Sequence, residues 1–455
     1  MNNDKRYREA LDWIHGLGRF GSRPGLERII VLLEMLGNPH HQLCFVHIGG
    51  TNGKGSTAAM LDSILRAAGC RTGLYTSPYL LSFTNRMAVN GSDIDHYQLV
   101  ELVDQIRPLV DKISCNEELG PLTEFEVVTA LALTYFARRK VDLVILEVGL
   151  GGRLDATNVV TPILSIITNI SLEHTDVLGN TVEAIALEKA GIIKQGRPLL
   201  TAAEDRRVLT ILEKRCDELK APFYRIYPGG TTVEEIMSEK PVAIIQKITA
   251  GGQYFAYRGF LLQLDDLFVP LRGSYQVNNA ATALAAVELL EEYGFSTDES
   301  SIRSGLAETN WPGRLEVLSE KPFLIMDGAH NPAAIEKLAA ALPQYFNYKK
   351  LILVIGVLAD KDTAAMLEHI LPRADTIIFT RPILPRAADP GEIAAFAVNY
   401  YALRNNYMVI YNHGEALEKA LEMAGPDDAV LVTGSLYTVS DVRAYWQQSQ
   451  DLAGK

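Results

Sequence analysis

Short apolar runs alternate with helical stretches over the first part of this chain. The runs cover residues 44–48, 73–76, 143–148, 163–167 and 199–201. Each is bounded by turn residues and is about as long as a single strand, and most of the connections between them have the length and pattern of a helix. The alternation predicts a largely parallel sheet covered by helices.

The pattern changes at residues 240–272, where VAIIQKIT, GQYFAYRG and FLLQLDDLFVPL follow one another with only turn residues between them. This predicts an antiparallel meander appended to the sheet. A helix closed by Gly294 comes next, and a polar stretch then leads to Asn310-Trp311-Pro312-Gly313. Beyond it, strand-like runs such as FLIMDG, LILVIGVL and AVLVTGS restart the βα alternation.

These patterns together predict an α/β protein of two domains. At 455 residues the chain exceeds the size at which a single hydrophobic core stops growing, about 250 to 300 residues. We expect an N-terminal domain over residues 1–309, with a mostly parallel sheet and the small meander. A smaller Rossmann-like α/β domain is expected over residues 310–455.

Composition narrows the classes of function. A formal charge of -12 and a pI near 5.3 argue against general affinity for nucleic acid or anionic membrane, because both need a basic face. Apolar residues nowhere run for the 18 or so that a spanning helix needs, so a cytoplasmic protein is expected. The four cysteines form no C-x-x-C pair, which fits neither a disulfide framework nor a zinc site.

A glycine-rich loop follows the first apolar run. Residues 44–48 indicate a buried strand, GGTNGKGS at 49–56 a loop, and 56–68 a helix ended by Gly69. Backbone N–H groups in such a loop can curl around an anion at a helix N-terminus, and Lys54 adds a full positive charge. The predicted ATP-binding residues here are Thr51, Asn52, Gly53, Lys54, Gly55 and Ser56.

The spacing of this loop departs from G-x-x-x-x-G-K-[ST], because Gly55 separates the lysine from the serine. The bland alternative is a flexible surface turn that carries a lysine. The loop alone would also suit a nucleotide-dependent motor or switch, although neither accounts for a second α/β domain. Gly149-Leu150-Gly151-Gly152 leaves a dinucleotide-binding protein as a weaker alternative, which would leave Lys54 unused.

Nine motifs spread along the chain resemble the folylpolyglutamate synthase and dihydrofolate synthase family. In order they are TNGKGS, LYTSPYLLSFTNRMAVNG, TEFEVVTALA, LEVGLGGRLDATNV, SLEHTDVLGNT, EKAGIIK, NNAATALAA, WPGRLEV and DGAHNP. The resemblance implies a member of the Mur ligase group that consumes ATP and adds L-glutamate to a folate through an acyl phosphate. It implies a bifunctional enzyme that also acts on dihydropteroate, with a folylpolyglutamate synthase alone, or a cell-wall Mur ligase, as alternatives.

The resemblance also implies two Mg²⁺ sites. Ser77 and Glu147 would bind one ion and His174 the second, and oxygen ligands suit Mg²⁺. Taken singly, Glu147 is equally a strand-end acid in solvent and His174 a capped loop histidine. Lys189 matches a lysine that the family carries as a carbamate able to hold the second ion, which requires a depressed lysine pKa. An ordinary surface lysine is the alternative, with Lys194 as the nearest rival.

Further site residues follow from the same resemblance. Asn279, Arg314 and Asp327 match positions that hold ATP, and His330 is expected near the same phosphates as a catalytic residue. Capping alone would explain DGAHNP, because Asp-Gly makes a turn and Asn-Pro starts a helix.

The pterin-binding positions of the family fall on two short segments, Thr123, Glu124, Phe125 and Glu126, and then Leu154, Asp155 and Ala156. Phe125 offers a flat face to a flat ring, with core packing as the alternative. Glu124 stands where family members often have an aromatic residue. The expected partners are small molecules only, namely ATP, L-glutamate and folate or dihydropteroate, bound by a monomer.

Overall fold

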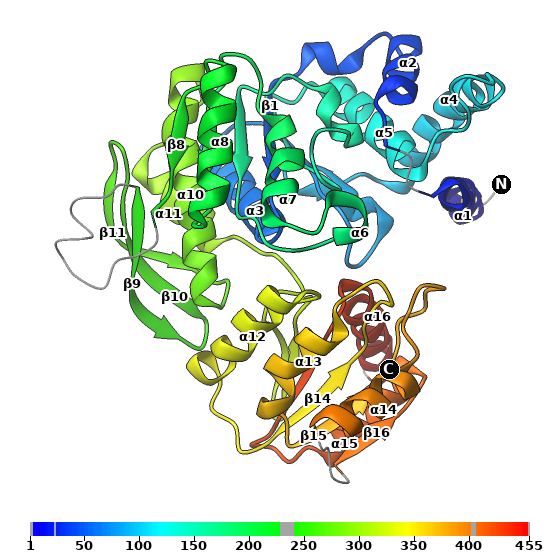
Figure 1. The fold of residues 1–455 in the computed structure, drawn as a ribbon, viewed down its shortest axis with the longest axis vertical. Helices are drawn as coiled ribbons and strands as arrows, with labels where there is room; N and C mark the ends of the chain where they lie inside the picture. The colour runs from blue at the N-terminus through cyan, green and yellow to red at the C-terminus, as the bar shows by residue number, and fades with distance from the viewer. Residues whose placement is uncertain (1–2, 22–23, 228–240, 402–405, 454–455) are drawn as a thin grey trace. The chain divides into compact units, whose positions relative to one another are not determined.

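A computed structural model of the chain describes residues 3–21, 24–227, 241–401 and 406–453 (Figure 1). These residues fall into two compact units. The first unit contains residues 1–244, 255–267 and 278–309, and the second contains 245–254, 268–277 and 310–455. The second unit is therefore assembled from three separate stretches of sequence.

The first unit is built on an eight-stranded sheet with the order β4-β3-β2-β5-β1-β6-β7-β8. Neighbours from β2 to β8 are parallel, and β3 and β4 pair antiparallel at one edge. The strands are β1 Phe45–Gly49, β2 Thr72–Tyr75, β3 Met87–Val89, β4 Ser92–Asp93, β5 Leu143–Glu147, β6 Leu164–Ile167, β7 Leu199–Thr201 and β8 Phe223–Arg225. The predicted parallel sheet is confirmed.

Helices cover this sheet, and as a result every residue of β1, β5 and β6 is buried. Phe45 of β1 packs in a core with residues of α2, α4 and α5, while α3 contacts β1, β2 and β5 and packs against α11. A second core joins α7 and α8 to β6 and β7 at the other end of the sheet, and Figure 1 shows these two helices beside each other. The α-helices are α1 Asn3–Gly16, α2 Glu27–Met35, α3 Lys54–Ala67, α4 His96–Ser114, α5 Glu124–Arg139, α6 Thr175–Leu178, α7 Val182–Lys189, α8 Arg206–Glu218, α10 Ser274–Leu290 and α11 Glu299–Ala307.

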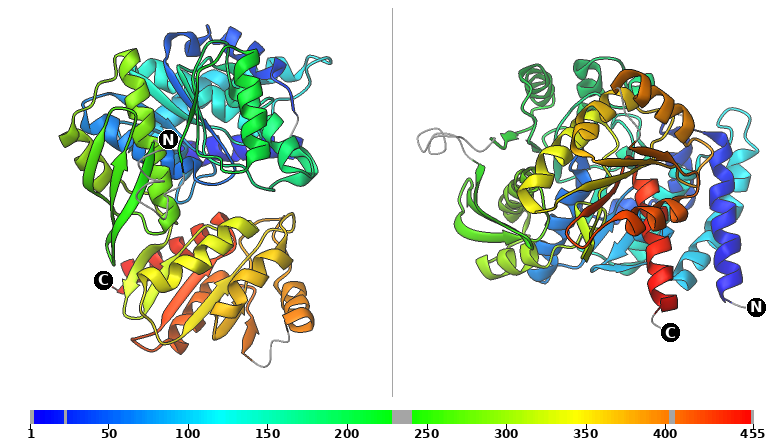
Figure 2. Two further views of the ribbon diagram at one scale, coloured as in Figure 1. Left: turned by 60° about the vertical axis from the view of Figure 1, so that its left-hand side comes forward. Right: turned by 90° about the horizontal axis from the view of Figure 1, so that it is seen from below.

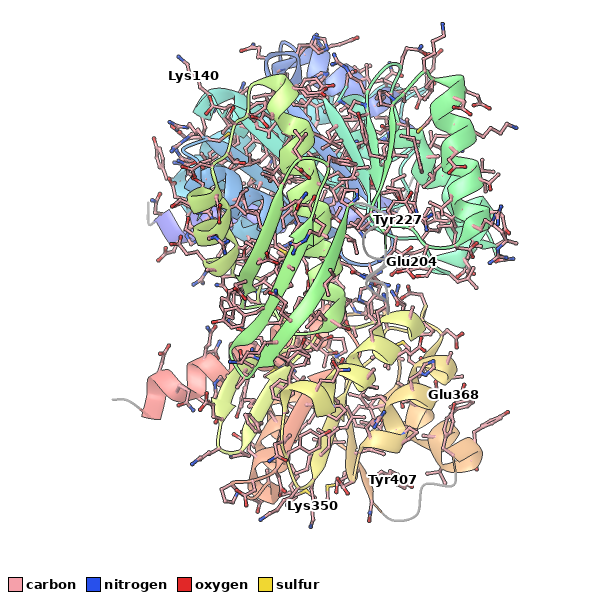
Figure 3. The ribbon with its side chains drawn as sticks, turned by 90° about the vertical axis from the view of Figure 1, so that its left-hand side faces the viewer. Lys140, Glu204, Tyr227, Lys350, Glu368 and Tyr407 are labelled. Carbon is pink, nitrogen blue, oxygen red and sulfur yellow. The ribbon has the colours of Figure 1, made fainter. Side chains whose placement is uncertain are left out.

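The predicted meander is present, but it forms a three-stranded sheet of its own rather than extending the parallel sheet. Its strands are β9 Val242–Thr249, β10 Gly252–Arg258 and β11 Gln263–Val269, which lie side by side in Figure 3. Short turns join consecutive neighbours, which makes the strands antiparallel. The three strands and α10 each contribute residues to both units.

The second unit contains a six-stranded sheet with the order β12-β13-β17-β14-β15-β16. All neighbours are parallel except β12 and β13. Helices α12 and α13 lie on one face and α16 on the other (Figure 2). The elements are β12 Glu316–Glu320, β13 Phe323–Met326, α12 Pro332–Tyr345, β14 Leu351–Ile355, α13 Thr363–Ile370, β15 Thr376–Phe379, α14 Pro390–Tyr401, β16 Tyr407–Val409, α15 His413–Met423, β17 Ala429–Thr433 and α16 Leu436–Ala453.

The predicted α/β class is thus confirmed. Among the described residues, every helix is too short or too polar to cross a membrane.

Candidate active site

The glycine-rich loop connects β1 to α3 at the carboxyl edge of the parallel sheet. Gly50 and Gly53 have φ of 137° and 88°, where a side chain would strain the backbone. Space forbids side chains as well: a Cβ on Gly50 would lie 2.0 Å from Thr168 Oγ1, and one on Gly53 would lie 2.5 Å from Asn279 Oδ1. Helix α3 starts at Lys54, two residues earlier than predicted, with Gly53 as its N-cap.

Residues that follow β6 hold the loop in shape. The N–H of Thr51 donates to the carbonyl of Asn169 at 2.8 Å, and the N–H of Asn52 donates to Asn169 Oδ1 at 2.9 Å. Thr168 Oγ1 donates to the carbonyl of Asn52 at 2.7 Å. Asn169 thus occupies these two N–H groups, whereas the N–H groups in the first turn of α3, from Lys54 onward, have no partner within the helix and can donate to an anion.

Two lysine ammonium groups meet at one carbonyl of this loop. Lys54 Nζ donates to the carbonyls of Gly50 and Thr51, each at 3.1 Å, and Lys189 Nζ donates to the carbonyl of Gly50 at 2.9 Å. Lys189 is only 5% exposed at the end of α7. Burial, and secondly the charge of Lys54, lower the pKa of Lys189 to about 7. An ammonium has three donors, so Lys54 keeps one for an anion.

Ser77 follows β2, Glu147 is the last residue of β5 and His174 follows β6. The carboxyl ends of these parallel strands share one edge of the sheet with the glycine loop. The N–H of Ser77 donates to Oε2 of the buried Glu147 at 3.2 Å. His174 has a left-handed backbone with φ of 50°, and its Nε2 lies 3.7 Å from Glu173 Oε1. Glu173 in turn lies near enough to Lys189 to oppose the fall of its pKa.

A Mg²⁺ ion fits the chemistry of these residues. No three His, Cys, Asp or Glu side chains gather into a metal cage in the part of the chain that the structure describes. Mg²⁺ does not require one, since it commonly uses one or two carboxylates together with water and substrate phosphates. The buried carboxylate of Glu147 and the neighbouring Ser77 match such a donor set.

The four predicted pterin-binding residues at 123–126 begin α5, and two of them form its cap. Thr123 Oγ1 accepts from the N–H of Glu126, while Glu126 Oε2 accepts from the N–H of Thr123 at 2.7 Å, a capping box. Arg28 Nε donates to the same carboxylate at 3.0 and 3.2 Å, and both side chains are buried. These contacts account for Glu126 without a ligand.

Phe125 lies among apolar and backbone atoms, whereas Glu124 lies among basic side chains. The ring of Phe125 lies directly on the backbone of Gly149, where a Cβ would come within 2.3 Å of it, and its centroid is 6.2 Å from that of Tyr75. Glu124 pairs with His15 at 3.5 Å and with Arg86 at 3.9 Å. Glu124, with its partners His15 and Arg86, therefore occupies the position where an aromatic residue is common in the family that the sequence resembles.

Phe125 brings the start of α5 beside the segment that carries Leu154, Asp155 and Ala156. Leu154 is 37% exposed and Ala156 is buried. Asp155 is also buried, and its carboxylate accepts from the N–H groups of Leu150 at 2.8 Å and Thr157 at 3.0 Å. Burial raises the pKa of Asp155, while these bonds and the hydroxyl of Thr157 act in the opposite direction.

In the second unit, Arg314, Asp327 and His330 lie close together. Asp327 Oδ2 accepts from the N–H of Leu315 and Oδ1 from that of Ala329, both at 2.9 Å, so this buried carboxylate ties the residue after Arg314 to the DGAHNP turn. Burial raises the pKa of Asp327, whereas the charge of Arg314 lowers it. His330 Nδ1 lies 2.8 Å from the carbonyl of Gly328. Asn331 caps α12, as expected for Asn-Pro.

Sequence reasoning missed the residues that hold these groups in place. Thr168 and Asn169 shape the glycine loop from more than 100 positions away, and no local pattern marks them. Arg86, whose side chain is 11% exposed, lies over the rings of Tyr79 and Phe83 at 5.2 and 5.7 Å. An arginine among aromatic residues in SPYLLSFTNR was the available signal.

Comparison with known proteins gives consistent matches along nearly the whole chain. The Mur ligase middle domain matches residues 48–287, and the Mur ligase, glutamate ligase domain matches residues 313–436. The chain is 37% identical to "Dihydrofolate synthase/folylpolyglutamate synthase" of Bacillus subtilis over 445 residues, which cover 96% of this chain and 98% of that protein.

Two solved structures extend this similarity to three dimensions. Folylpolyglutamate synthase of Mycobacterium tuberculosis, complexed with ADP and AMPPCP, has a TM-score of 0.87 at 32% identity and covers 96% of this chain and 98% of its own. E. coli FolC in complex with DHPP and ADP has a TM-score of 0.83 at 30% identity, with 98% of each chain covered.

Proposed function

The chain belongs to the Mur ligase family, among its dihydrofolate synthases and folylpolyglutamate synthases, and on this premise we propose how its residues join L-glutamate to a folate at the expense of ATP. The observation that carries the proposal is the meeting of Lys54 and Lys189 at the carbonyl of Gly50, beside the first turn of α3. Lys54 supplies positive charge and α3 supplies N–H donors at a helix N-terminus, where a phosphate is stabilised, and Lys189 lies beside the same loop.

Lys54 and the first turn of α3 hold the phosphates of ATP. The N–H groups from Lys54 to Ser56 would donate to phosphate oxygens, while Thr51 and Asn52 shape the loop through Asn169. Asn279, which lies against Gly53, borders the same nucleotide. Lys54 neutralises charge that develops on the transferred phosphoryl group, and such electrostatic stabilisation is the main source of rate in phosphoryl transfer.

Ser77 and Glu147 would hold one Mg²⁺ ion, and His174 with Lys189 a second. Bound there, the ions would neutralise phosphate charge and orient the γ-phosphate. Lys189 would contribute as a carbamate, which forms when a neutral amine adds to CO₂ and releases a proton. Burial of Lys189 beside Lys54 favours the neutral amine that this addition requires.

The reaction proceeds in two steps. A carboxylate oxygen of the pterin-bearing substrate attacks the γ-phosphorus of ATP, which gives an acyl phosphate and ADP. The amino group of L-glutamate then attacks the acyl carbon, phosphate leaves and the nitrogen loses a proton. The segments at Thr123–Glu126 and Leu154–Ala156 would bind the pterin, with Phe125 facing the ring and Glu126 and Asp155 shaping the two segments from within.

Residues 1–309 supply the ATPase and folate-binding part of this scheme, and residues 310–455 the ligase part. Arg314 and His330 would contact the nucleotide phosphates, and Asp327 would keep both in position through the N–H groups of Leu315 and Ala329. Correct placement of reactants is worth several kcal/mol in such reactions, about 7 to 11 kcal/mol in favourable cases. The protein would act in the cytoplasm as a monomer on these small molecules.

A phosphate-release assay tests the function and its breadth. Purified protein with ATP, Mg²⁺ and L-glutamate is given either dihydropteroate or tetrahydrofolate. Release with both substrates supports the bifunctional enzyme that we propose, and release with tetrahydrofolate alone indicates a folylpolyglutamate synthase. Release with neither substrate would contradict the folate assignment.

A further inference from the structure

A buried chain of hydrogen bonds runs from the central strand β1 to the segment 149–158. His47 lies on β1, two residues before Gly49, and is fully buried. Its Nε2 lies 2.8 Å from Thr157 Oγ1, and Thr157 Oγ1 is hydrogen-bonded to Asp155 Oδ1. The ATP-binding and pterin-binding parts of the proposed mechanism do not use His47 or Thr157.

The direction of each bond follows from the chemistry of the groups. Asp155 accepts N–H donors at both carboxylate oxygens, from Leu150 at Oδ2 and from Thr157 at Oδ1. The hydroxyl of Thr157 therefore donates to Asp155 and accepts from His47 Nε2–H. His47 Nδ1 has no hydrogen-bond partner among the residues that the structure describes, so the bond to Thr157 fixes the ring.

Burial, with Lys194 nearby, lowers the pKa of His47 to about 3. The imidazole is therefore neutral near pH 7, and its Nε2–H acts as a donor of fixed position.

The carboxylate of Asp155 shapes the segment from within. It caps the short helix η4 (Ala156–Val159) through the N–H of Thr157 and closes the turn that begins at Leu150. Removal of one partner from a buried network leaves a polar group unsatisfied, which destabilises the arrangement of the other partners. The orientation of Leu154 and Ala156, which flank Asp155, thus depends on the bonds that the Asp155 carboxylate accepts from Leu150 and Thr157.

The same segment packs against the residues around Lys189. The N–H of Arg153 donates to the carbonyl of Glu188 at 2.8 Å, and a Cβ on Gly152 would lie 3.0 Å from the Cα of Lys189. Asn158 Nδ2 donates to the carbonyl of Gly191 at 3.1 Å. A shift of segment 149–158 would therefore move the backbone that carries Lys189.

We propose that His47 and Thr157 are positioning residues for the ligation reaction: by orienting the Asp155 carboxylate they fix segment 149–158, and with it the pterin-binding residues and the backbone at Lys189. This inference rests on the proposed function. It assigns to His47 a role in folate binding although His47 is buried beneath the surface that the substrate would touch.

Matched substitutions in the full-length protein separate this role from simple stability. Thr157→Val keeps the shape of the side chain and removes the hydroxyl, while Thr157→Ser restores the hydroxyl. His47→Leu removes the donor, whereas the amide of His47→Gln can present an N–H close to the place of Nε2. Thr134→Val is the control, because Thr134 is a buried threonine whose hydroxyl donates to the carbonyl of Ala130 within its own helix.

The expected result is a split between the two substrates. Thr157→Val and His47→Leu should each raise KM for the folate substrate about tenfold and also lower kcat, through the backbone at Lys189, while KM for ATP changes less than about threefold. Combined, they should cost little more than either alone, because both break one network. Thr157→Ser and His47→Gln should recover much of the folate KM. An unchanged folate KM in folded Thr157→Val protein, or equal rises for ATP and folate, would overturn the proposal.

A second measurement does not depend on catalysis. Hydrogen exchange read by mass spectrometry should speed up in peptides over residues 149–158 and 188–194 of Thr157→Val, and stay unchanged over 351–355 of the second unit. Unchanged exchange at 149–158 and 188–194 would contradict the positioning role even if ligation were observed. Faster exchange without any folate ligation by the wild-type protein would instead contradict the proposed function.

Discussion

Charge and space at the glycine loop are set by single residues. Gly50 and Gly53 are required both by their positive φ and by the atoms of Thr168 and Asn279 that occupy the place of a side chain. Lys54 folds back onto the loop and donates to two of its carbonyls. An arriving phosphate therefore meets a lysine that is already held in place, so little side-chain entropy is lost on binding.

Replacement of Lys54 by Ala should abolish most ligation. One full charge near the transferring phosphate is lost, and by analogy with the loss of one charge-stabilising donor the rate should fall by about 10² to 10³. Phosphate release measures the effect, and circular dichroism checks the fold. Lys349→Ala is the matched control, because Lys349 is an exposed lysine paired with Asp427. Near-normal turnover of folded Lys54→Ala protein would contradict the phosphate-loop role.

The pKa of Lys189 predicts a pH dependence of carbamate formation. With the pKa lowered to about 7, the ammonium form dominates below that pH and the neutral amine above it. Only the neutral amine adds to CO₂, so carbamate and the activity that requires it should decrease as the pH falls from about 8 to about 6. The carbonyl resonance of protein exposed to ¹³C-labelled bicarbonate, with Lys189→Arg as control, measures this. A resonance that is absent at high pH, or that survives in Lys189→Arg, would exclude a carbamate at Lys189.

At the scale of helices and strands, buried carboxylates connect one element to another by accepting hydrogen bonds from its backbone or side chains. Glu288 on α10 accepts from the N–H groups of Phe260, Leu261 and Leu262 at 2.6 to 3.2 Å, and from the hydroxyl of Tyr257 at 2.6 Å. One side chain thus satisfies the turn between β10 and β11 and fastens the hairpin to a helix. Glu126 does the same for α2 and α5 through Arg28.

Conversion of Glu288 to Gln should destabilise the protein without touching the proposed active site. An amide loses the charge and turns one acceptor into a donor that faces buried N–H groups, which should lower the free energy of unfolding by about 2 to 4 kcal/mol. Urea denaturation measures the loss. Glu291→Gln, an exposed change in the short helix η6 (Glu291–Tyr293) that follows α10, should have almost no effect. Equal stability of the two variants would show that the Glu288 bonds contribute little.

Most elements were predictable because their signals are local. The strand at 199–201 is observed at the same residues, and β1 begins one residue later than expected, since buried parallel strands appear as continuous apolar runs. The glycine loop and the DGAHNP cap were also visible, as both depend on neighbouring residues. The bond between Thr51 and Asn169 and the bond between His47 and Thr157 each link positions more than 100 residues apart, and no local sequence pattern predicts such pairs.

On the scale of the whole chain, the second unit recruits residues that precede the long C-terminal stretch. Gln253 donates to the carbonyls of Leu271 and Gly273 at 2.9 and 2.8 Å and accepts from the hydroxyl of Tyr345 at 2.7 Å. Arg272 donates to the carbonyl of Leu315 at 3.1 Å. A chain cut at residue 310 would lose the bond between Gln253 and Tyr345 and the bond between Arg272 and Leu315, so substitutions in the full-length protein test the role of the second unit more cleanly.

Arg314→Ala in the full-length protein should weaken binding of a non-hydrolysable ATP analogue and reduce turnover further. The guanidinium would supply charge-assisted bonds to phosphate, each worth about 1.5 to 3 kcal/mol, so the affinity should fall about tenfold or more. Calorimetric titration measures the affinity. Arg303→Ala serves as the control, since Arg303 is a half-buried arginine outside the proposed site that pairs with Glu299 on α11. Wild-type affinity and turnover in Arg314→Ala would show that Arg314 takes no part in nucleotide binding.

The composite makeup of the second unit limits how this protein can be recombined. Its boundary crosses the chain at residues 244, 254, 267, 277 and 309, so no single splice point separates it from the first unit. A chimaera that exchanged residues 310–455 with those of a relative would import Tyr345 and Leu315 counterparts but keep the native Gln253 and Arg272. Grafts between relatives should therefore succeed only when residues 245–254 and 268–277 are exchanged together with residues 310–455. The two units are therefore expected to be inherited together.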